Sequence, residues 1–176
     1  MIDLNNYRLK LGENLDRSLL LLAGLSAEEL NWTVGDQWSL LQIAEHILLT
    51  EEMVMGILSD GSSELAEKLE LFGNDKLKDL MVNLRNHKVK TQRNLEPQGS
   101  IRNVQEFQSA MRLSRDTLVS NLKSGEWMVS TETYTHPMLG EMTVSDWLYY
   151  LLHHAERHQW QMKDRLAELG DARATQ

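Results

Sequence analysis

Cysteine is absent from the 176 residues of this chain, and proline occurs only twice. Without cysteine there is no disulfide, no thiolate-bound zinc or iron–sulfur cluster, and no thiol nucleophile. A metal ion would have to be held by His, Asp, Glu or water. The two prolines, Pro97 and Pro137, lie in segments whose composition is typical of a break and a turn.

Long apolar runs are also missing. The longest, from Leu19 to Leu25, has seven residues, whereas a membrane-spanning helix needs about 20. Charged residues precede this run, which is unlike a signal peptide. We therefore expect a cytoplasmic protein without a membrane partner.

An excess of positive charge is the third absence. The chain has 18 Lys and Arg against 26 Asp and Glu, for a net charge of −8, and a nucleic-acid-binding surface needs clustered basic residues. We expect no nucleic-acid partner. One region does gather basic side chains, and we interpret it as a solvated helix face: Lys76, Lys78, Arg85, His87, Lys88, Lys90 and Arg93.

What the chain does contain is helical periodicity, interrupted by breaks. Apolar spacing predicts helices over about 5–23, 40–58, 75–94, 103–123 and 143–169, the last ended by Gly170. A short strand or extended arm is predicted over 127–135. These elements predict one domain over residues 1–176. Its fold class is all-α, an up-down-type four-helix bundle with short additional helices.

Two histidines on the last predicted helix, His154 and His158, are four residues apart. This spacing places both imidazoles on one helix face, within reach of one metal ion. They lie in or beside the apolar stripe of that helix, where an unpaired polar group costs about 1–3 kcal/mol. The pair is either a set of metal ligands or two core histidines bonded to neighbouring side chains.

His46, on the helix predicted from Ser39, lies at the flank of an apolar face. Alone it is typical of a hydrogen-bonded core residue. Combined with His154 and His158 it completes a set of three nitrogens that suits Zn, Ni, Co or Fe(II) with open positions for water or substrate. Affinity for such a metal should fall as the pH drops through about 6.5, the ordinary histidine pKa.

Two further residues of this helix are candidate catalytic residues. Gln161, one turn after His158, could orient a bound molecule or hydrogen-bond a histidine. Arg157 shares a side with His153 and Trp160, and this trio either packs on another helix or a partner chain, or presents Arg157 to a substrate carboxylate. Elsewhere, His87 is interpreted as solvated. His136, in a turn, is interpreted as structural or as part of a site rim.

Several catalytic motifs are missing. The chain has no glycine-rich phosphate-binding loop, no GxSxG nucleophile elbow and no HExxH metalloprotease motif. Glu45 directly precedes His46, but we expect its side chain to point elsewhere. No side chain stands out as a nucleophile.

Three blocks of sequence together carry a family resemblance. They are Trp38 to His46, His136 to Leu148, and the segment from His154 to Gln161 that contains His-x-x-x-His. Their order and separation resemble the DinB-like superfamily of four-helix-bundle proteins, including its YfiT-like metal-dependent hydrolases and thiol S-transferases.

This resemblance implies a site for a divalent metal, Zn or Ni, held by His46, His154 and His158, and a homodimer. It also implies a small-molecule substrate. In some members a metal activates a low-molecular-weight thiol such as bacillithiol, mycothiol or glutathione, and in others it activates water for hydrolysis. Arg157 stands before the second histidine of the block, unlike in some thiol transferases, so both chemistries stay open. The alternative is a non-catalytic, stress-related bundle protein that binds a metal or a small ligand.

Overall fold

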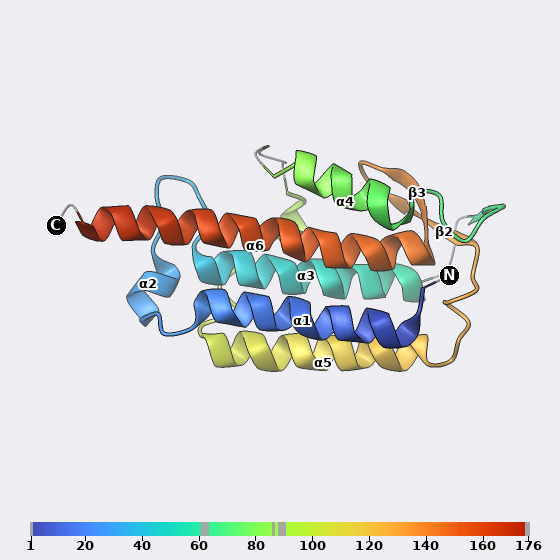
Figure 1. Cartoon of the computed structure of the whole chain (residues 1–176), viewed down its shortest axis with the longest axis horizontal. Helices are drawn as coiled ribbons and strands as arrows, with labels where there is room; N and C mark the ends of the chain where they lie inside the picture. Colours follow the sequence, from blue (N-terminus) through green and yellow to red (C-terminus); the bar gives the residue numbers. More distant parts are fainter. Residues whose placement is uncertain (1, 61–63, 86, 88–90, 175–176) are drawn as a thin grey trace.

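Four long helices lie side by side in a computed structural model of the chain, which describes residues 2–60, 64–85, 87 and 91–174 (Figure 1). They are α1 (Leu4–Leu22), α3 (Leu40–Ser59), α5 (Val104–Leu122) and α6 (Val144–Ala174). Helix α6 packs on α1 and α3, and α5 packs on the same two helices. The predicted all-α bundle with short additional helices is confirmed.

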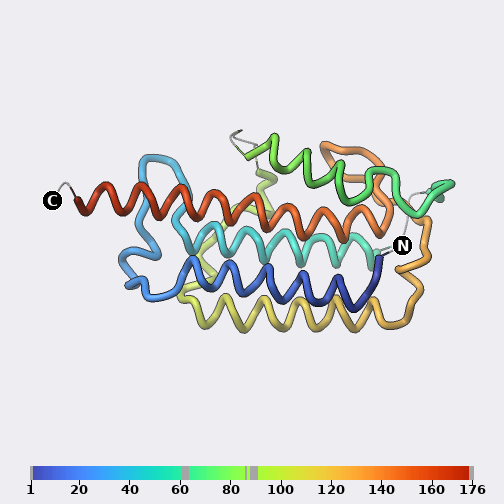
Figure 2. Tube along the Cα trace, viewed as in Figure 1, coloured from blue at the N-terminus to red at the C-terminus, as the bar shows by residue number. Residues whose placement is uncertain are grey.

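The bundle helices run in two directions (Figure 2). Helices α1 and α6 run the same way, since Tyr7 donates to the Leu148 carbonyl and Gln159, further along α6, donates to Ser18. Helices α3 and α5 both run the opposite way. The chain therefore has to return between them, and it does so through α4 (Gly73–Asn83), which packs on α6, and the short 3-10 helix η1 (Arg93–Leu95).

Local hydrogen bonds explain where the helices begin. Ser39 and Gln42 form a reciprocal capping box at the start of α3, where the sequence predicts the helix to begin. At the start of α6, the Asp146 amide donates to the Thr143 hydroxyl while Thr143 donates its own amide to the Asp146 carboxylate. The same carboxylate accepts the backbone N–H groups of residues 71–73, so the cap of α6 also holds the start of α4.

The helix predicted over 75–94 is shorter than expected. Helix α4 ends at Asn83, and the carbonyls of Leu84 and His87 accept hydrogen bonds from Arg157 on α6. A side chain from another helix thus satisfies groups that a longer helix would have paired internally. Within the predicted basic face, Lys88 and Lys90 lie outside the described residues.

The last helix is longer than expected. It continues through Gly170 to Ala174, and Gly170 does not adopt the left-handed backbone that ends many helices. A glycine inside a helix costs only about 0.5–1 kcal/mol relative to alanine. The apolar spacing correctly predicted this helix, but Gly170 alone was a weak indication of where the helix ends.

The predicted extended arm is part of a small sheet. Strand β2 (Glu132–His136) pairs antiparallel with β3 (Gly140–Thr143) and with β1 (Glu64–Leu65). The strand therefore starts at Glu132 rather than at residue 127, and its hairpin leads directly into α6. Its turn brings Met138 and Leu139 to the cavity described below. No described helix is both long and apolar enough to cross a membrane.

Candidate metal centre

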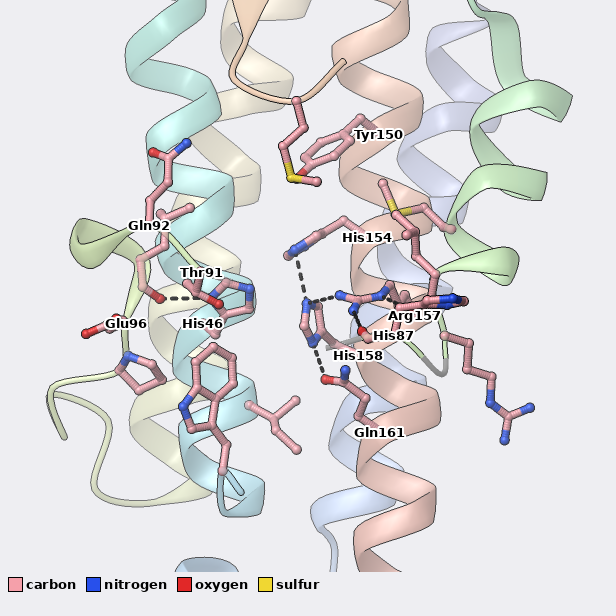
Figure 3. Close-up of a pocket in the computed structure, with 18 of the residues that line it drawn as sticks. His46, His87, Thr91, Gln92, Glu96, Tyr150, His154, Arg157, His158 and Gln161 are labelled. Atoms are coloured by element: carbon pink, nitrogen blue, oxygen red, sulfur yellow. Dashed lines mark hydrogen bonds between the residues drawn. The ribbon is translucent and has the colours of Figure 1, made fainter. Parts of the chain in front are cut away.

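The three predicted histidines come together between α3 and α6 (Figure 3). His46 comes from α3, His154 and His158 come from α6, and all three are buried. One ring nitrogen of each lies within 4.8 Å of the corresponding nitrogen of the others. The distance between Nε2 of His154 and Nε2 of His158 is 3.1 Å. Residues more than a hundred positions apart thus form one cluster that could hold a metal ion.

Hydrogen bonds on the far side of two rings assign their protons. Nδ1 of His46 lies 2.8 Å from the Leu95 carbonyl, which can only accept, so Nδ1 donates and Nε2 keeps its lone pair. Nδ1 of His158 lies 2.7 Å from Oε1 of Gln161, which has the same consequence. A neutral imidazole with a free Nε2 is the form that binds metals, and carbonyl partners of this kind orient such ligands.

The donor set fits a divalent metal. Two nitrogens bound tetrahedrally at about 2.0–2.1 Å from one ion lie roughly 3.4 Å apart, close to the 3.1 Å between His154 and His158. The lone pair of His158 Nε2 faces the Nε2 of His154 at this distance, which is favourable when a proton or a cation lies between them. Imidazole nitrogens suit Zn and Ni among the common metals.

An open cavity adjoins the cluster. It has a volume of about 1000 Å³, and the three histidines are part of its lining. Apolar side chains make up much of the remaining wall, among them Met53, Met81, Leu84 and Leu139. A metal ion held by three nitrogens at this position would keep coordination sites that face space for a ligand, which is typical of catalytic rather than structural sites.

Aromatic rings enclose the cluster on both sides. Trp38 lies 4.8 Å from the His46 ring, and Tyr150 stacks on His154 at 5.4 Å. His136, at the end of β2, contacts Tyr150 at 5.1 Å, and its Nδ1 accepts the amides of its own turn. Burial lowers the pKa of His136 to about 4 and raises the pKa of Tyr150 to about 12. Both groups are therefore neutral at physiological pH. His136 lines the cavity and also holds its own turn, so the structure agrees with both interpretations considered for it.

Burial also keeps the three clustered imidazoles neutral. It lowers the pKa of His46 and holds the pKa values of His154 and His158 well below the ordinary 6.5, and the charge of Arg157 acts in the same direction. Protons therefore compete for these nitrogens only at lower pH than the sequence suggested. The expected loss of metal affinity near pH 6.5 is displaced downwards, because the isolated-histidine pKa ignores burial.

The other candidates on α6 have defined places. Gln161 hydrogen-bonds His158 through Oε1 and also lines the cavity, so it orients this ring. His153 bonds to Asn74 of α4, and the ring of Trp160 lies under the guanidinium of Arg85 at 4.3 Å. These side chains pack against another segment of the chain, as one interpretation predicted. His87 is exposed, as expected, although it lies at the edge of the cavity.

Glu45 is a site residue that sequence reasoning missed. Its side chain is buried and accepts hydrogen bonds from the backbone amides of Gln98, Gly99 and Ser100 and from the Ser100 hydroxyl. Burial alone would raise the pKa of Glu45, but these donors lower it overall. The carboxylate thus anchors the loop that starts at Leu95, whose carbonyl orients His46. Glu45 does point away from the metal position, as expected, but it has this second role.

Tyr150 was missed as well, although the sequence held a signal. It lies four residues before His154 on the same helix, so the spacing that linked the two histidines also places Tyr150 on their face. For Glu45 and the Leu95 carbonyl no such signal exists, since the contact spans about fifty residues.

Comparison with known families fits this arrangement. A family model for the DinB superfamily matches residues 10–162. The chain belongs to the DinB superfamily. The DinB match includes His46, His154, His158 and Gln161, and it confirms the resemblance seen in the sequence blocks.

One curated relative is the uncharacterized protein YuaE of Bacillus subtilis (strain 168). It is 26% identical over 149 residues, which cover 81% of this chain and 86% of the relative. No solved structure matches the chain.

Proposed function

We propose that this member of the DinB superfamily is a metal-dependent enzyme whose divalent ion, Zn or Ni, is held by His46, His154 and His158. The observation that carries the proposal is the combination of three inward nitrogens with an adjoining open cavity. A structural metal site would instead be closed by a fourth protein ligand. No fourth His, Asp or Glu joins the group among the described residues.

The bound ion would supply Lewis acidity and lower the pKa of a thiol or water molecule placed in the cavity. The chain's own residues orient the ligands through Leu95 and Gln161, and the rings of Trp38 and Tyr150 pack against His46 and His154. Because the chain contains no cysteine, thiol chemistry would need a low-molecular-weight thiol as cosubstrate.

Of the two reactions, thiol S-transfer has the better support. A cavity of about 1000 Å³ is at the upper end for a single small ligand, which typically occupies 300–1000 Å³. It therefore has room for a thiol and an electrophile together. Hydrolysis would need room for one substrate and water. The homodimer implied by the resemblance stays a prediction.

The test has two stages. Protein purified without an affinity tag is analysed for metal content and then assayed with bacillithiol, mycothiol and glutathione against 1-chloro-2,4-dinitrobenzene, and with nitrophenyl esters for hydrolysis. We expect one metal ion per chain and metal-dependent turnover of one substrate class. Stoichiometric metal without turnover would support the non-catalytic alternative, and absence of metal binding would overturn the proposal.

Variants assign the site. His46→Ala should abolish stoichiometric metal binding even though it lies far from the His-x-x-x-His pair, because two nitrogens do not hold a divalent ion firmly. His87→Ala is the matched control, an exposed histidine at the edge of the same cavity, and should bind metal like the unmodified protein. Full metal occupancy in His46→Ala would contradict the assignment.

A further inference from the structure

Arg157 carries a buried positive charge directly beside the histidine cluster. Its side chain is only 9% exposed. Nε donates to the Leu84 carbonyl and Nη2 to the His87 carbonyl, both at 3.1 Å. Nη1 lies 3.4 Å from Nε2 of His158 (Figure 3). Two of its nitrogens thus fix the guanidinium to the end of α4, and the third faces the proposed metal position.

No carboxylate among the described residues forms an ion pair with Arg157. Two acidic side chains of α6 that line the cavity are already engaged, Asp164 by Arg85 and Glu168 by Arg165. Backbone carbonyls and an imidazole offer partial charges only. Burying an ion without an opposite charge is costly, so this guanidinium lacks the partner that a buried arginine normally has.

A metal ion at the histidine cluster would sharpen the imbalance. Three neutral imidazoles bring no negative charge, so a divalent ion and Arg157 would share one region with a charge of about +3, and among the described residues no carboxylate joins the histidine group or pairs with Arg157. The Nε2 atom of His158 would also be occupied by the metal, and Nη1 of Arg157 would lose its acceptor. A charged N–H group would then face the cavity next to the metal.

We propose that Arg157 binds a carboxylate of the substrate, so that the natural substrates are small carboxylic acids with an apolar remainder. The carboxylate supplies the missing negative charge and accepts the hydrogen bond of Nη1. The apolar remainder lies against the cavity wall that Met53, Met81 and Leu139 provide. This inference deepens the proposed function and rests on it for the neighbouring metal, while the charge of Arg157 itself is independent of any metal.

Calorimetric titration with hexanoate and its neutral analogue hexanamide tests the proposal. The decisive measurement uses metal-free protein at pH 8, where the three clustered histidines are neutral and Arg157 is the cation in question. A charge-assisted hydrogen bond is worth about 1.5–3 kcal/mol, so hexanoate should bind at least about tenfold more tightly than hexanamide. Equal binding of the two ligands by the unmodified protein would overturn the proposal.

Two arginine variants locate the effect. Arg157→Met should lose the preference for hexanoate while retaining its affinity for hexanamide. Arg85→Met is the matched control, since Arg85 lines the same cavity but pairs with Asp164 and Trp160, and it should keep the preference. A preference that survives in Arg157→Met, or disappears in Arg85→Met, would contradict the assignment.

Arg157 also joins α6 to the end of α4, so Arg157→Met could fail to fold. Arg157→Lys then serves as the second variant, because it keeps the positive charge but loses the planar guanidinium. Its preference for hexanoate should be present but weaker than that of the unmodified protein. The zinc and nickel content of each sample is measured separately. Failure to bind either zinc or nickel would overturn the proposed function alone, whereas failure to prefer hexanoate would overturn the role of Arg157 alone.

Discussion

Two buried arginines in this bundle have opposite surroundings. Arg115 on α5 is 7% exposed and Arg157 on α6 is 9% exposed. The guanidinium of Arg115 contacts both carboxylate oxygens of Glu51 at 3.1–3.2 Å, donates to Asn14 at 3.0 Å and also bonds the Leu11 carbonyl. Arg157 has two carbonyls and one imidazole nitrogen.

The comparison separates a structural cluster from a functional one. The Arg115 cluster is complete within the chain, because charge meets charge and both α1 and α3 contribute partners to the arginine of α5. The region around Arg157 is incomplete, because nitrogen lone pairs and a positive charge meet at an open cavity and no described carboxylate pairs with Arg157. A folded chain tolerates such an incomplete site at a cost in stability, and incomplete sites of this kind are characteristic of binding and catalysis.

The largest expected effect comes from breaking the complete cluster. Glu51→Gln keeps the shape of the side chain but leaves Arg115 buried without a counter-charge, which should lower the free energy of unfolding by about 3–5 kcal/mol. Urea unfolding followed by circular dichroism measures this. The matched control is Glu52→Gln at the neighbouring, exposed position, which should change little. Equal stability of the two variants would show that the pair is not needed.

Acid should weaken the incomplete cluster first. The pKa values of His154 and His158 lie well below the 6.5 of an unfolded histidine, so below pH 6.5 the unfolded chain binds more protons than the folded one. The metal-free protein should therefore lose stability as the pH falls from 6.5, by up to about 1.4 kcal/mol per pH unit for each such histidine. Burial raises the pKa of Glu51. A raised pKa in the folded state increases stability as the pH falls, so Glu51 cannot cause this loss.

Urea unfolding of the metal-free protein at pH 7.5, 6.5 and 5.5 measures this dependence. The double variant His154→Gln/His158→Gln should show a flatter dependence than the unmodified protein. An unchanged slope in that variant would mean that other groups cause the acid sensitivity.

A smaller effect should distinguish two glutamines of α6, one beside the histidine cluster and one facing α1. Gln161 orients His158, whereas Gln159, two residues earlier, is buried and donates to Asn14 and Ser18 of α1. Gln161→Leu should weaken zinc affinity by about 10–100-fold, as is usual for a residue that orients a ligand. Gln159→Leu should lower stability instead and leave zinc affinity unchanged. Competition with a zinc-binding dye measures the affinities, and equal affinities in both variants would contradict the role of Gln161.

The smallest expected effect is at Gly170, which lies outside both clusters. A Cβ added at Gly170 would meet nothing within 4 Å, and the residue has ordinary helical geometry. Gly170→Ala should therefore raise the free energy of unfolding by about 0.5–1 kcal/mol without changing metal binding. A lower melting temperature would instead indicate that the helix ends at this glycine, as its sequence position suggested.

Local features of the sequence predicted most of the fold. The helix starts predicted at Ser39 and at residue 143 agree with the structure within a residue or two. The errors arose where a distant partner intervenes. Just beyond the end of helix α4, the carbonyls of Leu84 and His87 accept hydrogen bonds from Arg157, about seventy residues away. No pattern within 75–94 could reveal those contacts.

For the candidate site, the order of the chain was enough to place His154 beside His158, because four residues make one helical turn and the period of a helix is a local property. The other contacts depend on how α3, α5 and α6 pack. This packing brings His46 to the pair and lets Glu45 anchor the loop behind it. It also places Glu51 against Arg115, whereas Arg157 has no carboxylate partner among the described residues. These contacts join residues about 50 to 110 positions apart. Their distances follow from the side-by-side packing of helices, which no local spacing in the sequence encodes.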